Sequence, residues 1–288
     1  MRNFTEFSIT EAVLKQIANT RDPRTRRISA ALVHHLHDFL REVRPTQEEW
    51  ARGIEFLTAT GKMCIDSRQE FILLSDTLGV SMLVDAVNHG NGDGVTESTV
   101  LGPFYIQEPP EFEAGADISG GLAGQPMLVT GLVSSSDGHP IADAIVDVWH
   151  SDEDGYYDVQ NTGPEAGLAG RARLHTDTSG RFHCWSIKPA AYPIPHDGPV
   201  GQMLEAQGRH PWRPAHVHFI IAAPGYETLV THVFVAGDQY LDSDAVFGVK
   251  DSLIREFTEY PAGKAPDGKI MSRDYCTLIY DFHLKACT

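Results

Sequence analysis

The sequence predicts an α+β protein in which a helical N-terminal segment precedes an all-β sandwich. Three observations predict this order. Apolar residues recur at helical spacing as far as about residue 88, a stretch rich in glycine and proline follows without any periodicity, and the segments after it alternate in polarity or run β-branched. We expect a helical domain over residues 1–105 and a β-sandwich domain over residues 106–288.

The helical segment contains two apolar stripes at the spacing of one helix face. The first stripe consists of Ile28, Leu32, Leu36, Phe39 and Val43, and the second consists of Trp50, Ile54 and Leu57. Three expected helix starts have a Ser or Thr followed three residues later by Glu, the spacing of a capping box. These pairs are Ser8 with Glu11, Thr46 with Glu49, and Ser67 with Glu70. We therefore expect several amphipathic helices before residue 89.

Five later segments have the composition and alternation of strands. They are AIVDVWH (144–150), GRFHCWSI (180–187), AHVHFIIAA (215–223), TLVTHVFVA (228–236) and YCTLIYDFHL (275–284). Turn signals at Ser136-Asp137-Gly138 and Thr178-Ser179-Gly180 separate some of the strands. This pattern of several short strands with polar turns is typical of a sandwich.

Composition excludes two classes of partner. The net charge of −16 would repel nucleic-acid backbones and anionic lipid headgroups. No apolar run approaches the roughly 18 residues that a spanning helix needs, and the start MRNFTEFSIT does not resemble a signal peptide. The cysteines at 64, 184, 276 and 287 are scattered, which suits reduced thiols, with one incidental disulfide as the alternative. We expect a cytoplasmic protein with no nucleic-acid partner and no membrane partner.

Two histidines in the segment HPWRPAHVH suggest half of a metal site. His216 and His218 are one residue apart in an expected strand, where alternate side chains share a face. An isolated pair of this kind is at least as often a pair of hydrogen-bonded core histidines. Arg213 and Pro214 directly precede the pair, and tyrosines lie in the loop segments DEDGYYDVQNTG and PAAYPIPHDGP, where ligands are commonly placed. Taken singly, each tyrosine is more often a packing residue.

Four motifs together are more specific than the histidines alone. VWHSDEDGYYDVQ, PAAYPIPHDGP, HPWRPAHVHF and FVAGDQYLDSDAVFGVKDSL resemble, in order and spacing, the intradiol ring-cleaving dioxygenases. The likeness covers most of the chain, including a helical N-terminal part that ends in LGPFY. It implies four metal ligands, namely Tyr157, Tyr192, His216 and His218. The family pattern of Gly, one residue and then the ligand Tyr selects Tyr157 over its neighbour Tyr156.

The resemblance also implies the cofactor and the reaction. Two phenolates with two neutral imidazoles favour Fe(III), one per subunit, over zinc, copper or divalent iron. An aromatic diol would chelate the ion and react with O2, with both oxygen atoms entering a dicarboxylate product. In this family the equivalent of Tyr192 leaves the metal and accepts a substrate proton. Arg213 is the candidate for stabilising charge on the ring, with a structural salt bridge as the alternative.

The substrate is indicated less directly. The resemblance implies a pocket lined by Leu73, Asp76, Val100, Leu101, Gly102, Pro103, Phe104, Ile194, Pro195, Arg213 and Val246. Asp76 interrupts an apolar helix face and could accept a hydrogen bond from a third ring hydroxyl, although an exposed helix position is an equally good interpretation. Catechol-cleaving relatives have glutamine at the position of His232. The chain looks most like the members of this family that cleave hydroxyquinol, with catechol and chlorocatechols as alternatives.

Two other classes of protein remain open. A noncatalytic β-sandwich binding module would need none of the tyrosines, and a zinc hydrolase would need a nearby Asp, Glu or Cys ligand that the motif does not offer.

The resemblance further implies a homodimer formed through the N-terminal helices, with a phospholipid bound between them. The predicted activity is therefore intradiol cleavage of hydroxyquinol in aromatic catabolism, with an aromatic diol or triol and O2 as small-molecule partners.

Overall fold

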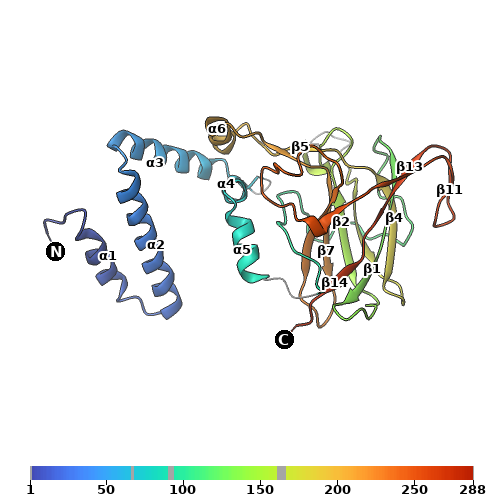
Figure 1. Ribbon diagram of the computed structural model, residues 1–288, viewed down its shortest axis with the longest axis horizontal. Coiled ribbons are helices and arrows are strands. Elements are labelled where there is room, and N and C mark those ends of the chain that lie inside the picture. Colours follow the sequence, from blue (N-terminus) through green and yellow to red (C-terminus); the bar gives the residue numbers. More distant parts are fainter. Residues whose placement is uncertain (1, 66–67, 90–93, 161–166, 288) are drawn as a thin grey trace. The chain divides into compact units, whose positions relative to one another are not determined.

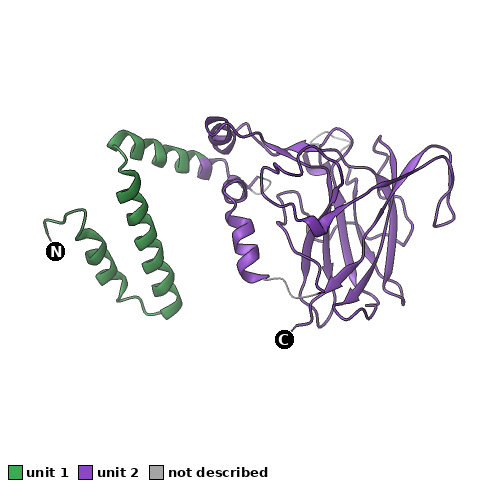
Figure 2. Cartoon of the chain, in the orientation of Figure 1, with its two compact units in different colours: residues 1–59 green, residues 60–288 purple. Residues whose placement is uncertain are grey.

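A computed structural model describes residues 2–65, 68–89, 94–160 and 167–287. The chain forms two compact units, residues 1–59 and residues 60–288, which we describe separately (Figure 2). The units divide inside a helix, whereas the predicted domain border at residue 105 follows the change from helical to strand patterns. That border stays a prediction. No helix in the described ranges is long and apolar enough to cross a membrane.

The first unit is helical. It contains α1 (Ile9–Ile17), α2 (Pro23–Val43) and most of α3 (Gln47–Lys62), which continues into the second unit (Figure 1). The apolar stripe predicted along residues 28–43 lies on α2, but no residue of α2 is buried in this chain. Its members Leu32 and Phe39 are 63% and 54% exposed, and Trp50 on α3 is 55% exposed. The apolar face of these helices is therefore uncovered in the single chain.

The helix starts agree only partly with the capping boxes. The box at Thr46 is confirmed, because its backbone N–H donates to Glu49 (2.7 Å) and the N–H of Glu49 donates to the Thr46 hydroxyl (3.2 Å). Ser8 precedes α1 but forms no cap, since it is in helical conformation and its hydroxyl accepts from the N–H of Thr5. Ser67 lies outside the described residues. The start of α2 is capped by Asp22, which sequence patterns did not single out.

The second unit begins with α4 (Glu70–Thr77) and α5 (Val80–Asn88), and α6 (Pro199–Ala206) follows later in the chain (Figure 1). A buried carboxylate connects α4 with α6. Glu70 accepts two hydrogen bonds from the Arg68 guanidinium, and its other oxygen accepts from the N–H of Val200 in the first turn of α6. Glu70 therefore fixes α4, the helix of Asp76, against α6, which follows the loop of Tyr192.

The remainder of the second unit is the predicted sandwich of two five-stranded sheets. One sheet has the order β10-β13-β1-β14, with β4 paired to the other edge of β1. Its strands are β1 (Pro126–Ser135), β4 (Arg181–Ile187), β10 (Thr258–Tyr260), β13 (Tyr275–Ile279) and β14 (Phe282–Leu284). The predicted strand at residues 275–284 is thus two strands, which pair with successive parts of β1. Sequence patterns did not identify β1 itself.

The other sheet has the order β3-β2-β7-β8-β9 and supports the metal centre. Its strands are β2 (Ile145–His150), β3 (Arg171–His175), β7 (His216–Ala222), β8 (Leu229–Val235) and β9 (Ile254–Arg255). Val217, Phe219 and Ile221 of β7 belong to the apolar core between the sheets. Because side chains alternate along a strand, His216 and His218 project from the opposite face of this sheet.

Short elements complete the second unit. They are the ribbons β5 (Tyr192–Pro193) with β6 (Trp212–Arg213) and β11 (Gly263–Lys264) with β12 (Ile270–Met271), and the single turns η1 (Asp158–Gln160) and η2 (Asp251–Leu253). The β5–β6 ribbon pairs Tyr192 directly with Arg213, which brings two predicted site residues together. The architecture confirms the predicted α+β class.

Candidate metal centre

The two histidines of β7 are held with their outer ring nitrogens close together. Nε2 of His216 lies 3.1 Å from Nε2 of His218, and both residues are 1% exposed. Nδ1 of His216 lies 2.7 Å from the carbonyl oxygen of Pro214, which can only accept, so Nδ1 carries the proton and Nε2 has a free lone pair. Burial lowers the pKa of both imidazoles well below the usual value for histidine. Both rings are therefore neutral, as metal ligands must be.

A tyrosine hydroxyl completes one side of the cluster. Tyr157 is 1% exposed, and its hydroxyl lies 2.7 Å from Nε2 of His218. Tyr156, by contrast, is 62% exposed. Tyr192 is buried with its ring 5.2 Å from that of Tyr157, and Nη1 of Arg213 is 3.4 Å from its hydroxyl. Burial raises the pKa of Tyr157 well above its usual value, so this group becomes a phenolate only beside a strong positive charge.

Glycine makes this approach of the two tyrosines possible. Gly155 has φ +88°, a conformation that side chains rarely adopt. A Cβ at this position would lie 2.8 Å from the Cβ of Tyr192 and 3.0 Å from the carbonyl oxygen of Ala191. The Gly-x-Tyr pattern therefore has a steric reason, because a side chain at residue 155 would push the loop of Tyr157 away from Tyr192.

The donor set fits a metal ion. Two nitrogens bound at about 2.1 Å to one ion, at right angles to each other, lie about 3 Å apart. The 3.1 Å between the Nε2 atoms of His216 and His218 matches that spacing, and the hydroxyl of Tyr157 faces the same point. Such a buried group of neutral imidazoles and phenols is explained by a cation that binds them together. The cluster is a metal site.

A third imidazole stands beside the pair but points differently. His232 of β8 lies opposite His218 in the strand register, and its ring stacks on that of His216 at 4.7 Å. With His216 and His218 it forms a group of potential metal ligands. However, Nη2 of Arg213 lies 3.4 Å from Nδ1 of His232. A guanidinium only donates, so Nδ1 accepts and the proton of the neutral ring is on Nε2. Nδ1 of His232 is thus an acceptor for Arg213, as Nε2 of His216 also is at 3.3 Å.

Arg213 lies against the ligand cluster. Its side chain is buried, with Nη1 3.3 Å from Nε2 of His216 and 3.4 Å from the hydroxyl of Tyr192. Nε and Nη2 donate to the two oxygens of Asp244. Burial is the largest single influence and would lower the pKa of Arg213, but the charge and hydrogen bonds of Asp244 together with Tyr192 and Tyr157 outweigh it, and the pKa is raised. The guanidinium therefore stays charged although it is buried.

Some of the predicted pocket residues lie beside this cluster. Phe104 stacks on Tyr157 with 4.5 Å between ring centroids, and a Cβ at Gly102 would lie 3.2 Å from Cε1 of His218. Asp76 is 4% exposed rather than on the surface, and burial raises the pKa of its carboxyl group. An open groove is lined by Asp76, Gly102 and their neighbours Val100 and Leu101.

Other predicted pocket residues are not tied to the cluster in the same way. Leu73, Ile194 and Val246 are buried and Pro195 is half-buried. Leu101 is exposed, as is Pro103. The contact of these side chains with a substrate stays a prediction.

Sequence patterns missed two residues that shape the site. Trp149 pairs with His218 across β2 and β7 and stacks on its ring at 4.5 Å. Asp244 binds Arg213. The alternation in AIVDVWH placed Trp149 on a strand and could have placed it beside His218, had the pairing of β2 with β7 been known. Nothing distinguishes Asp244 from Asp242 in the segment YLDSDAVFG.

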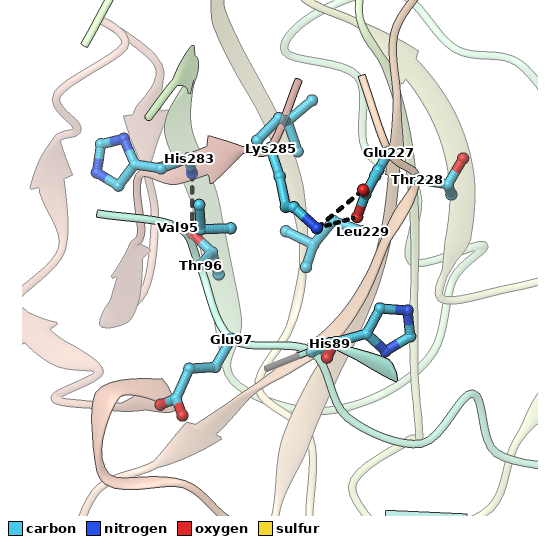
Figure 3. A pocket seen from close by; sticks show the side chains of 11 residues that line it. His89, Val95, Thr96, Glu97, Glu227, Thr228, Leu229, His283 and Lys285 are labelled. Carbon is cyan, nitrogen blue, oxygen red and sulfur yellow. Dashed lines mark hydrogen bonds and ion pairs between the residues drawn. The ribbon is translucent and has the colours of Figure 1, made fainter. Parts of the chain in front are cut away.

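The structure contains a further small pocket away from the metal centre (Figure 3). It is lined by residues 95–98, 227–229 and 283–285 together with His89. Lys285 pairs with Glu227 at 2.9 Å, and the N–H of His283 donates to the Thr96 hydroxyl, as the dashed lines show. These polar groups of the pocket lining thus pair with one another, and none of the predicted site residues lines this pocket. We assign this pocket no function.

The exposure of the two adjacent tyrosines leads to a prediction about the ligand. Tyr157→Phe should weaken metal binding and remove the visible charge-transfer colour that a tyrosinate bound to the implied Fe(III) would give, because it deletes the buried hydroxyl beside His218. Tyr156→Phe is the matched control and should change neither. Metal analysis and an absorption spectrum of both purified variants check this. If Tyr156→Phe lost the colour and Tyr157→Phe kept it, the ligand would be the neighbouring residue.

Similarity to known proteins extends over most of the chain. The family described as "Dioxygenase" matches residues 100–286, and "Catechol dioxygenase N terminus" matches residues 22–96. The chain is 54% identical to 6-chlorohydroxyquinol 1,2-dioxygenase of Cupriavidus pinatubonensis, over 91% of this chain and 95% of that protein. It is 49% identical to hydroxyquinol 1,2-dioxygenase of Nocardioides simplex, over 97% of this chain and 95% of that protein. The solved structure of hydroxyquinol 1,2-dioxygenase from Pseudomonas putida superimposes with a TM-score of 0.91 at 46% identity, covering 98% of this chain and 99% of that one.

Proposed function

The chain belongs to the intradiol dioxygenase family, and from this premise we propose that it is a ferric hydroxyquinol 1,2-dioxygenase. The reaction cleaves hydroxyquinol (1,2,4-trihydroxybenzene) between adjacent hydroxylated carbons with O2. It yields 3-hydroxy-cis,cis-muconate, a tautomer of maleylacetate, in the catabolism of aromatic compounds. The observation that carries the proposal is the buried cluster of two imidazoles and two phenols beside Asp76, in a chain 49% identical to a hydroxyquinol 1,2-dioxygenase.

The proposed cofactor is one Fe(III) ion per subunit, held by Tyr157, Tyr192, His216 and His218. Phenolate is a hard anionic donor, and two of them beside neutral imidazoles suit a trivalent ion better than zinc. When bound, ferric iron lowers the pKa of the diol hydroxyls that coordinate it and draws electron density from the ring. Nε2 of His216 has a lone pair for the metal, because the ring proton is on Nδ1, which donates a hydrogen bond to the Pro214 carbonyl oxygen.

Three side chains act on the substrate in this proposal. Tyr192 accepts a proton from a ring hydroxyl at its own oxygen, the atom that Arg213 Nη1 faces at 3.4 Å. Arg213 stabilises negative charge that develops on the ring, because its buried guanidinium is already oriented and needs no solvent to rearrange. Phe104, stacked on Tyr157, keeps water from the reacting carbons.

Asp76 is the residue through which we assign the substrate. Its carboxyl group is buried beside the site. At an exposed helix position it would instead face solvent. The carboxyl group has a side-chain hydrogen bond with Ser81. Because a carboxylate can accept several hydrogen bonds, the third hydroxyl of hydroxyquinol can donate a further one, which catechol cannot. The second candidate substrate is 6-chlorohydroxyquinol, which the 54% identical relative cleaves according to its name. It has the same third hydroxyl, so Asp76 serves both.

Oxygen uptake tests the proposed substrate. The iron-loaded protein should consume O2 in equal amount to added hydroxyquinol and should turn over catechol and chlorocatechols more slowly. Parallel assays with 6-chlorohydroxyquinol separate the two triols. Faster turnover of catechol than of both triols would make the protein a catechol 1,2-dioxygenase, and no uptake with any diol would leave a binding module.

Asp76→Asn should change selectivity. The substitution is expected to lower turnover of hydroxyquinol by roughly 10-fold or more while changing turnover of catechol much less, since only the triol presents a hydroxyl to that wall. Steady-state kcat/KM for both substrates measures this. Asp242→Asn, an exposed neighbour of the Arg213 partner Asp244, is the control and should behave like the unmodified enzyme. Equal losses for both substrates would remove Asp76 from substrate recognition.

We also propose a homodimer formed through the first unit, with a phospholipid bound between the helices. What supports this is the uncovered apolar face of α2 and α3, since a monomeric protein seldom leaves so many large apolar side chains in water.

Light scattering at micromolar concentration should give twice the 31.7 kDa of one chain. Leu32→Glu should shift the mass toward the monomer, whereas Arg24→Glu on the same helix should not. A monomer mass for the unmodified protein would contradict the dimer, and an organic extract without acyl chains would contradict the lipid.

A further inference from the structure

The guanidinium of Arg213 divides its hydrogen bonds between two sides. Nε donates to Oδ1 of Asp244 at 3.0 Å, and Nη2 is 3.3 Å from Oδ2 of Asp244 and 3.4 Å from Nδ1 of His232. Nη1 alone faces the ligand cluster, at 3.4 Å from the hydroxyl of Tyr192 and 3.3 Å from Nε2 of His216. Because the guanidinium is planar, hydrogen bonds to Nε and Nη2 also fix the direction in which Nη1 points.

Asp244 is itself rigidly placed. Its two oxygens accept backbone hydrogen bonds from Val246 (3.3 Å) and Gly248 (2.9 Å), and its side chain is 2% exposed. Gly248 leaves room for the pair, because a Cβ at that residue would lie 3.0 Å from Nη2 of Arg213 and 3.2 Å from Oδ2 of Asp244. Loop 244–248 therefore presents a fully engaged carboxylate to one side of the guanidinium.

His232 is held by packing against the ligand rings. It lies on β8 and is 0% exposed, with its ring centroid 4.7 Å from that of His216 and 4.2 Å from that of His218. Because the guanidinium can only donate, Nδ1 of His232 is an acceptor toward Arg213. This imidazole therefore has a partner in Arg213, although sequence comparison alone left its role open.

We infer that Asp244 and His232 are positioning residues, which together aim Nη1 of Arg213 at the place where the ring carries its developing charge. The inference rests on the proposed function for the identity of the ring and on the hydrogen bonds of Arg213 for the direction of its side chain. Neither residue touches substrate in this account. Each acts through Arg213, so its loss should matter only while Arg213 is present.

The expected kinetic result is a fall in kcat with little change in KM. Asp244→Asn keeps the shape of the side chain but removes the charge and one of the two acceptor oxygens. A displacement of about 1 Å at a catalytic group costs up to about 10²-fold in rate, so kcat should fall by roughly 10- to 100-fold. Iron content and the visible band should remain, because none of the four candidate ligands is changed. Asp242→Asn, exposed and two residues away, is the matched control.

A double-mutant cycle separates positioning from general damage. In an Arg213→Ala background, Asp244→Asn should lower kcat by no more than about 2-fold, since the group that it aims is already gone. An equal loss with and without Arg213 would overturn the inference, as would an unchanged kcat in the single variant. His232→Leu and His232→Gln form a second pair, in which Gln restores an acceptor oxygen and should recover most of the rate that Leu loses. This pair decides the question if Asp244→Asn does not fold.

Crystal structures give a readout that does not depend on activity. In Asp244→Asn, Nη1 of Arg213 should move away from the hydroxyl of Tyr192, beyond the 3.4 Å of the unmodified chain. An unmoved guanidinium would overturn the inference. If the unmodified protein failed to cleave hydroxyquinol, the proposed function would be wrong, but the displacement of Arg213 would still answer whether Asp244 aims it.

Discussion

Replacing either His216 or His218 with alanine is expected to abolish iron retention. Each substitution removes one of only four proposed protein ligands, and each leaves the Tyr157 phenol, whose pKa is raised by burial, without a partner that would favour its ionised form. The loss should be large because the two Nε2 atoms stand 3.1 Å apart and jointly define the place of the ion. Metal analysis by plasma emission and the visible absorption spectrum measure the result.

The control for this pair is His139→Ala. His139 is 80% exposed in a turn of the sandwich and should keep one iron per chain. Retention of stoichiometric iron by both His216→Ala and His218→Ala would exclude them as ligands. Retention by one of them, with loss on His232→Ala, would instead place the third imidazole on the metal and reverse the proton assignment made from Arg213.

Arg213→Ala should separate catalysis from binding. Turnover is expected to fall by roughly 10²- to 10³-fold, the usual loss when one preorganised charge-stabilising donor is deleted. Iron, colour and the spectral shift on adding a diol should persist, since Arg213 is not among the proposed ligands. Steady-state oxygen uptake gives kcat and KM, and a titration of the visible band gives affinity.

Lysine at this position should restore only part of the rate. An ammonium on a flexible stem can replace the charge but cannot keep the fork that Asp244 holds along one edge. Arg273→Ala, at an exposed arginine of the same unit, is the control and should be unaffected. Near-normal turnover in Arg213→Ala would make the buried pair with Asp244 a structural salt bridge and nothing more.

The sequence predicted the parts of the fold that depend on local periodicity. The α+β order is confirmed, and so are the strands that carry His216 and His232, because alternation and β-branching are properties of short segments. The pairing of strands is not local. That β13 and β14 both pair with β1, an element that sequence patterns missed, depends on contacts more than a hundred residues apart.

The same distinction applies to the site. Ordered motifs led to the prediction that Tyr157 and the β7 histidines are ligands, and Gly155 gives one of those motifs a steric cause. Asp244 could not be selected, because one aspartate in an acidic segment looks like another until the fold brings it to Arg213. Ser8 shows the opposite error, since a correct capping pattern was overridden by a local hydrogen bond to Thr5.

The measurement that tests the central claim most directly is cleavage of hydroxyquinol under ¹⁸O₂ by the iron-loaded protein, followed by mass spectrometry of the product. Intradiol cleavage with O2 predicts that the ring opens between the two adjacent hydroxylated carbons and that both labelled atoms appear in the dicarboxylate, one in each new carboxyl group. A product with an aldehyde at one new end, or one that carries no label, would contradict the account.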